Sequence, residues 1–105
     1  MYIKYKKNEL EDFFESSPVY IGDEEADECM FSLKENGFGI VFYVSGYAMR
    51  VEISISYGNH SVYRGFLNNV TEIKEVEGGA LAITTNQQVV SVSKQPQIGI
   101  AFEEI

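Results

Sequence analysis

Residues 29–56 read CMFSLKENGFGIVFYVSGYAMRVEISIS, and apolar and polar side chains alternate along most of the first and last thirds. A period of two is typical of β-strands, because successive side chains point to opposite faces of a sheet. Asn36-Gly37 separates two of the runs, and this dipeptide is a strong hairpin signal. The run 38–44 is apolar on both faces, which predicts a central strand. The stretch therefore predicts three consecutive antiparallel strands.

The rest of the chain continues the same rhythm. Turn signals recur about every 8–12 residues, the spacing typical of all-β domains. Further strands are expected at 61–67, 70–76, 80–85, 88–93 and 98–102, giving seven or eight strands after residue 28. No helical stretch is available there for parallel crossovers, so the strands should pair antiparallel. A mainly β fold follows, an antiparallel β-sandwich or half-barrel with one short N-terminal helix.

The N-terminal part supplies that helix. Asn8 has the residue type of a helix N-cap, and Glu11 three residues later would complete a capping box. One apolar helix face follows at positions i, i+3 and i+4: Leu10, Phe13 and Phe14. Because the residue before Pro18 avoids the helical conformation, we predict a helix over 8–17. Brief strands are expected on either side, at 2–5 and 19–21. At this length we expect one domain spanning residues 1–105.

Charge is distributed unevenly along the sequence. The formal net charge is −8, and residues 8–33 contain nine acidic side chains and no Lys or Arg. These side chains are Glu9, Glu11, Asp12, Glu15, Asp23, Glu24, Glu25, Asp27 and Glu28. Such a field attracts cations and can raise encounter rates by roughly 10- to 1000-fold. Nucleic acids and anionic membranes are disfavoured as partners, because both require cationic surfaces. The alternative is that the acidic run serves solubility alone.

The chain offers few residues for catalysis or metal binding. Cys29 is the only cysteine and His60 the only histidine, which excludes an intrachain disulfide and a thiolate metal cluster. Cys29 follows the apolar alternation and is interpreted as a core residue, whereas His60 belongs to a turn beside Gly58-Asn59. The acidic segment lacks the spacing and the central glycine of an EF-hand loop. We therefore predict a protein that is not an enzyme, with no cofactor and no metal site.

Two features of the sequence bear on the cellular compartment of the protein. The N-terminal residues MYIKYKKNELED lack the apolar segment of a secretion signal, and no apolar run reaches the roughly 20 residues that cross a membrane. A lone thiol suits a reducing compartment. We expect a cytoplasmic protein.

Binding is the remaining class of function. Carboxylates can mimic phosphates towards Arg and Lys, and tyrosines are frequent interface anchors. We therefore expect the nine carboxylates to meet a basic protein, with four tyrosines as anchors: Tyr20, Tyr47, Tyr57 and Tyr63. Two other classes stay open. One is a small β-barrel carrier of an apolar ligand, and the other is a structural subunit that assembles through an edge strand.

The segment MYIKYKKNELEDFFESSPVY at 1–20, followed by the acidic segment and the β-rich remainder, resembles contact-dependent growth inhibition (CDI) immunity proteins. The resemblance covers the whole chain as a general pattern and includes no catalytic motif. It implies a small cytoplasmic bacterial protein that binds one toxin domain and blocks its active site. Many such toxins are nucleases, including ribonucleases of the pancreatic-ribonuclease fold, whose basic RNA-binding clefts would match an acidic surface. The family shares no motif from which site residues carry over.

Overall fold

The computed structural model of the chain describes residues 2–22, 27–77, 79–95 and 97–104. Its regular structure begins with helix α1 (Lys7–Phe14) and strand β1 (Val19–Tyr20). Within the described residues the remaining elements are β2 (Glu28–Glu35), β3 (Phe38–Ser45), β4 (Arg50–Tyr57), β5 (His60–Leu67), β6 (Val70–Val76), β7 (Ala80–Thr85), β8 (Gln88–Ser93) and β9 (Gly99–Glu104). The strands predicted at 70–76, 80–85 and 88–93 match to the residue.

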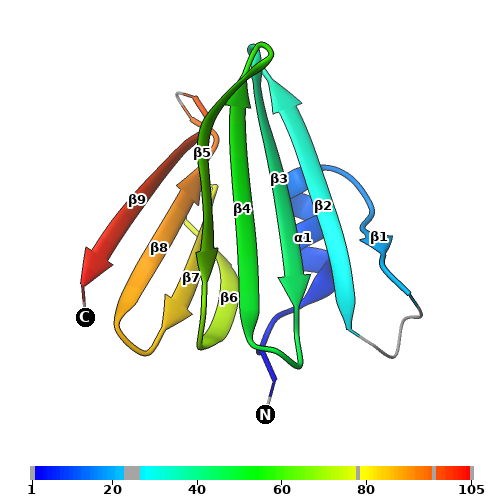
Figure 1. Cartoon of the computed structure of the whole chain (residues 1–105), viewed down its shortest axis with the longest axis vertical. Helices are drawn as coiled ribbons and strands as arrows, with labels where there is room; N and C mark the ends of the chain where they lie inside the picture. Colours follow the sequence, from blue (N-terminus) through cyan, green and yellow to red (C-terminus); the bar gives the residue numbers. More distant parts are fainter. Residues whose placement is uncertain (1, 23–26, 78, 96, 105) are drawn as a thin grey trace.

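The strands form two antiparallel sheets, with order β1-β2-β3-β4-β5 in the first and β6-β7-β8-β9 in the second (Figure 1). Within each sheet, neighbours in space are neighbours in sequence, so each sheet is a meander. This arrangement confirms the predicted fold class, a mainly β sandwich or half-barrel with one short N-terminal helix. Strand β3 is central in the first sheet, as its apolar sequence predicted.

The Asn-Gly hairpin is also confirmed. Glu35 pairs with Phe38, which leaves Asn36 and Gly37 as a two-residue loop. Their φ angles are 52° and 85°, and a type I′ turn requires positive φ at both central residues. The local sequence therefore sets the register of the β2–β3 pair.

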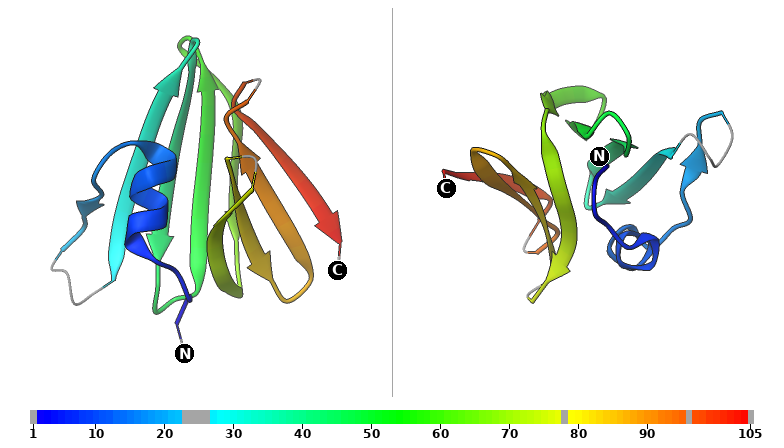
Figure 2. Two further views of the ribbon diagram at one scale, coloured as in Figure 1. Left: turned by 180° about the vertical axis from the view of Figure 1, so that it is seen from behind. Right: turned by 90° about the horizontal axis from the view of Figure 1, so that it is seen from below.

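Helix α1 fills the space between the two sheets. It contacts β2 of the first sheet and β6 of the second, and Figure 2 shows it over the inner face of the first sheet. Its buried side chains are Leu10, Phe13 and Phe14. The Phe14 ring centroid lies 5.3 Å from that of Phe31 on β2 and 5.3 Å from that of Phe42 on β3. The interior of the half-barrel is thus packed with the protein's own aromatic side chains.

The helix boundaries differ from the prediction. The N-cap is Lys6, which makes no side-chain cap hydrogen bond, so the capping box of Asn8 and Glu11 is wrong. The backbone N–H groups of Glu9 and Leu10 donate to the Lys6 carbonyl at 3.1 and 3.4 Å, and Asn8 lies inside the first turn. The helix ends at Phe14 instead of residue 17, because the next residue adopts the left-handed conformation.

The N-terminal segment also pairs differently from the expectation. Instead of a strand at 2–5, Lys4 forms a single parallel bridge with Glu72 at the edge of β6. The Lys4 N–H donates to the Thr71 carbonyl at 2.9 Å, and the Ile73 N–H donates to the Lys4 carbonyl at 3.0 Å. Pairing is therefore antiparallel in both sheets but parallel at this bridge. The local pattern at 2–5 indicated an extended backbone and carried no information about its distant partner.

Across the part of the chain that the structure describes, no helix has both the length and the apolar character required to cross a membrane.

Candidate protein-binding surfaces

The predicted carboxylates fall into separate regions. Asp23, Glu24 and Glu25 lie outside the described residues. Asp27 and Glu28 lie at the start of β2, at the end of the first sheet where β3 finishes. The remaining four lie on α1 or directly after it: Glu9, Glu11, Asp12 and Glu15. The described acids of the run therefore belong to two parts of the fold, the helix region and the start of β2.

The carboxylates at the start of β2 are held by tyrosine hydroxyls. The Tyr5 hydroxyl donates to Asp27 Oδ1 at 2.7 Å, and the Tyr43 hydroxyl donates to Glu28 Oε1 at 2.6 Å. Ser45 Oγ donates weakly to the same Glu28 oxygen at 3.5 Å. Burial and the bond to Asp27 raise the pKa of Tyr5 well above its usual range. The bond to Glu28, followed by desolvation, raises the pKa of Tyr43 to about 12. Both phenols are therefore neutral donors at physiological pH.

Two of the acids on or after α1, Glu9 and Glu15, contact β6 and the residue that follows β8. Glu9 Oε1 accepts the backbone N–H of Glu75 at 2.8 Å, which satisfies a donor on the exposed edge of β6. Desolvation and the nearby carboxylates of Asp12 and Glu9 raise the pKa of the Glu75 carboxyl. Glu15 lies 3.5 Å from the Lys94 ammonium. Glu9 and Glu15 therefore already have partners within the fold, while Glu11 is half-buried and Asp12 is exposed.

Two of the predicted tyrosines are half-buried. Tyr20 lies on β1, and the Lys7 ammonium lies 4.5 Å from its ring centroid. Tyr63 on β5 packs against the core, and its ring centroid lies 6.0 Å from that of Phe102 on β9. Both rings contribute to packing, and Tyr63 joins the two sheets.

The other two tyrosines are exposed, but they lie at opposite ends of the first sheet. Tyr47, in the β3–β4 turn, is 63% exposed, and Tyr57, at the end of β4, is 52% exposed. The neighbouring Gly46 N–H donates to the Asp27 carbonyl at 2.9 Å, so Tyr47 belongs to the end that carries Asp27 and Glu28. The structure therefore combines one predicted tyrosine with two predicted carboxylates.

The only cysteine and the only histidine are far apart. Cys29 is buried, and burial raises the pKa of its thiol, as befits the predicted core residue. His60 is exposed at the start of β5. Along β4, the positions level with these residues are Val51 and Tyr57, which implies a separation of roughly 20 Å. They form no nucleophile–base pair. In the described ranges, no group of three or more His, Cys, Asp or Glu is placed to hold a metal ion.

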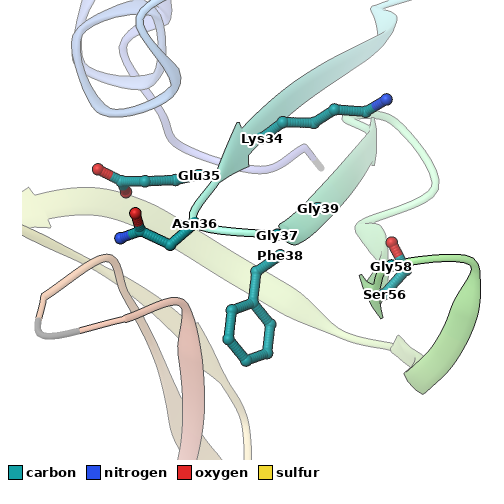
Figure 3. A pocket seen from close by; sticks show the side chains of 8 residues that line it. All are labelled: Lys34, Glu35, Asn36, Gly37, Phe38, Gly39, Ser56 and Gly58. Carbon is teal, nitrogen blue, oxygen red and sulfur yellow. The ribbon is translucent and has the colours of Figure 1, made fainter.

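A surface hollow of about 350 Å³ lies at the β2–β3 hairpin (Figure 3). Its charged side chains, Lys34 and Glu35, point away from each other, as consecutive residues on a strand do. Glu35 Oε2 is buried and has no hydrogen-bond partner among the described residues. Since its polar groups do not converge on one point, the hollow lacks the arrangement of a small-molecule site.

A surface that the sequence analysis did not single out lies on the outer face of the first sheet, which is turned to the viewer in Figure 1. Cross-strand pairing places Val19, Met30, Tyr43, Glu52 and Phe66 in one row across all five strands. We call its apolar members, together with Val41 beside them, the outer stripe: Val19, Met30, Val41, Tyr43 and Phe66. Val19, Val41 and Phe66 are 61, 40 and 49% exposed. The available signal was the two-sided apolar pattern of β3, which predicted a central strand but did not indicate that one of its faces is exposed.

Charged side chains on this outer face are Glu28, Lys34, Arg50, Glu52 and Arg64. The Arg50 guanidinium lies 4.0 Å from the ring centroid of Phe66, a cation–π contact. Arg64 Nε lies 3.0 Å from Glu52 Oε1. Arg50 therefore covers part of the Phe66 ring, and the Arg64–Glu52 pair lies beside the stripe on β4 and β5.

Comparison with known proteins identifies a solved structure with a similar fold. No family model and no curated protein matches the chain. A solved structure described as "Contact-dependent growth inhibition toxin - immunity protein complex from Klebsiella pneumoniae 342" contains a similar chain, with a TM-score of 0.78 at 18% identity. The likeness covers 100% of this chain and 100% of the other. This chain therefore has, over its whole length, the fold of a protein from a contact-dependent growth inhibition toxin–immunity complex.

Proposed function

We propose that this chain is an immunity protein, which binds a basic cognate toxin domain and neutralises it by covering its active site. The observation that carries the proposal is the full-length likeness to a chain from a toxin–immunity complex. It agrees with the independent resemblance of the sequence to CDI immunity proteins. That resemblance also makes a ribonuclease the favoured toxin and the bacterial cytoplasm the favoured compartment.

Charge favours the immunity role over the toxin role. A toxin that cleaves RNA has to bind a polyanion, which requires a cationic surface. This chain carries a net charge of −8, and residues 8–33 contain no Lys or Arg. An acidic chain is instead suited to occupy the basic cleft of such a toxin. The separation of Cys29 from His60 also agrees with a protein that binds and does not catalyse.

The structure does not support the alternative function, a β-barrel carrier of an apolar ligand. A carrier of an apolar ligand needs an interior space, as in larger β-barrels. Here α1 inserts Phe13 and Phe14 between the sheets, against Phe31 and Phe42. The protein's own side chains occupy the place where a ligand would bind.

Co-expression with candidate basic toxin domains, first of all ribonuclease toxin domains of secreted effectors, tests the proposal. We expect the chain to restore growth of cells that produce the toxin domain, to copurify with it as a one-to-one complex, and to inhibit its cleavage of RNA in vitro. Growth arrest that persists although both proteins are soluble, together with no binding at low salt, would overturn the proposal.

The acidic run can be tested separately through the association rate. Replacing Asp23, Glu24 and Glu25 by Asn or Gln should slow association by severalfold at low salt and change dissociation less. Asp27 and Glu28 are left intact, because their carboxylates accept hydrogen bonds from tyrosines. A control variant with the same charge change replaces three exposed acids elsewhere: Glu77, Glu103 and Glu104. Equal association rates for both variants would assign the acidic segment to solubility.

A further inference from the structure

The outer stripe has the composition of the centre of a protein interface. Interface centres are enriched in aromatic residues, Met and Arg, and are usually surrounded by a polar rim. The stripe combines Tyr43, Phe66 and Met30, and Arg50 lies on the Phe66 ring. Because an isolated outer sheet face is normally polar, partly exposed apolar side chains on four of its five strands require an explanation.

A hollow adjoins the stripe. Lys34, Gly39 and Ser56 form one row across β2, β3 and β4, and Gly39 contributes no side chain to it. A hollow of about 200 Å³ results on the outer face, with Ser32 and Val41 among its lining residues. Figure 3 shows Gly39 near Lys34 and Ser56. A flat apolar stripe next to a hollow of this size is suited to receive a protruding side chain of a partner.

The outer face is large enough to form much of one side of a protein interface. Strands β2 to β5 are each eight residues long, so the face measures roughly 26 by 19 Å, on the order of 500 Å². A standard interface buries about 800 Å² on each partner. The outer face with the adjoining β2 end, where Asp27 and Glu28 lie, approaches that area.

Charge distinguishes between two possible partners of the outer face, a second copy of this chain and a basic protein. A second copy of this chain would bring together two molecules that each carry a net charge of −8, and their repulsion opposes association. A basic partner gains energy from the same field. The outer face itself carries three cations, Lys34, Arg50 and Arg64, against two carboxylates, Glu28 and Glu52. The attraction to a basic partner therefore comes from the net charge of the chain and from Asp27 and Glu28 at the β2 end, and the stripe contributes apolar contact.

We propose that the outer stripe is the surface on which the cognate toxin domain docks. This inference rests on the proposed function and names its interface. The toxin domain would place an apolar or aromatic protrusion against Tyr43, Phe66 and the hollow at Gly39. Its basic side chains would face the end of the sheet that carries Asp27 and Glu28. In this arrangement the stripe holds the complex together, while the acidic segment accelerates encounter.

The test compares two phenylalanines of similar exposure on different sheets. Phe66 is 49% exposed on the outer face, and Phe102 is 47% exposed on β9. Titration calorimetry with the purified toxin domain should show Phe66→Ala weakening binding by about tenfold or more, and Phe102→Ala by less than about twofold. Ser32→Trp, which fills the hollow from an exposed position, should weaken binding similarly. Thermal unfolding of each variant confirms that it is folded.

The outcomes separate the two proposals. If the wild type binds the toxin domain and both Phe66→Ala and Ser32→Trp bind as tightly, the docking surface is wrong while the proposed function stands. If the wild type itself fails to bind, the proposed function fails and the docking surface with it. If light scattering instead shows a concentration-dependent dimer that Phe66→Ala abolishes, the stripe serves a second copy and this inference is overturned.

Discussion

The Tyr43 hydroxyl donates a 2.6 Å hydrogen bond to Oε1 of Glu28, across the antiparallel pair of β2 and β3. The bond joins an acid of the sequence's acidic run to the outer stripe. It holds the Glu28 carboxylate against the sheet, at the end where the β3–β4 turn begins. Because a phenol can donate only while it is protonated, this contact is lost at strongly alkaline pH.

Tyr43 is therefore expected to ionise later than an ordinary tyrosine. Its pKa is raised from 10.0 to about 12, first by the hydrogen bond to Glu28 and then by desolvation. Since the pKa is higher in the folded state, the contribution of this bond to stability is complete below pH 10. It is then lost as pH rises towards about 12. Carbon-13 chemical shifts of the tyrosine ring, followed against pH, give the pKa directly.

Glu28→Gln should lower the pKa of Tyr43 towards 10.0, because the charged acceptor that favours the neutral phenol is gone. Glu103→Gln, the same change at an exposed position on β9, is the control and should leave the Tyr43 titration unchanged. A Tyr43 titration identical in wild type and Glu28→Gln would show that this bond is not formed in solution.

Gly46 is expected to tolerate no side chain. It is buried beside Asp27, and a Cβ at this position would overlap the Asp27 carboxylate. Its N–H donates to the Asp27 carbonyl, and its carbonyl accepts the Ile3 N–H at 3.0 Å. Gly46→Ala should therefore lower the free energy of unfolding by about 1–3 kcal/mol. Urea denaturation measures the change.

Gly99→Ala on β9 is the matched control for this substitution. Its Cβ would meet Ser93 Oγ at 3.5 Å, an ordinary contact, so it should be neutral or slightly stabilising. Equal losses at the two positions would point to a general effect of removing a glycine and would contradict the predicted overlap with Asp27.

Glu15 is a position where substitution should stabilise the protein. It ends α1 with φ of 55°, a conformation in which a side chain costs about 1–2 kcal/mol. Glycine avoids that strain, but the 3.5 Å ion pair with Lys94 is then lost. Because exposed pairs contribute only about 0–1 kcal/mol, Glu15→Gly should gain up to about 1 kcal/mol.

Glu15→Ala separates the relief of backbone strain from the loss of the ion pair, because it loses the ion pair with Lys94 but keeps a Cβ. The glycine variant should melt at a higher temperature than the alanine variant in calorimetry. If alanine equals or exceeds glycine, then backbone strain at residue 15 is not significant.

Local signals explain why most of the fold could be predicted. The type I′ turn at Asn36-Gly37 and the alternation of β4 depend on neighbouring residues only, so the sequence contains them directly. The parallel bridge from Lys4 to Glu72 and the N-cap at Lys6 depend on packing between segments far apart in sequence. Periodicity cannot indicate which of several strand edges a segment such as residues 2–5 will join.

The candidate surface was less predictable for the same reason. Acidic composition identified Glu9 and Glu28, but only the fold shows that Glu9 accepts the Glu75 N–H and Glu28 the Tyr43 hydroxyl. Apolar residues on both faces of β3 correctly predicted a central strand, yet Val41 is 40% exposed because nothing in the described structure packs on that face. Sequence gives the alternation of side chains, whereas exposure depends on which faces the sheets and the helix cover.

The last prediction concerns the Phe14 side chain, which anchors α1 between the sheets. Phe14 is fully buried, and its ring packs against Phe31 and Phe42, with centroids 5.3 Å away in each case. Truncation to alanine removes these contacts and leaves a cavity, so Phe14→Ala should cost about 3–5 kcal/mol. Since a domain is stable by only about 5–15 kcal/mol, this variant approaches the limit of folding.

Phe14→Leu keeps most of the apolar volume and is the variant that remains measurable, with an expected loss below that of alanine. Phe102→Ala is the exposed control, since its side chain is 47% exposed and should cost about 1 kcal/mol or less. Urea denaturation should rank the losses as Phe14→Ala, then Phe14→Leu, then Phe102→Ala. A loss at Phe14→Ala no larger than at Phe102→Ala would mean that α1 does not pack between the sheets, because only a helix in that position buries this ring.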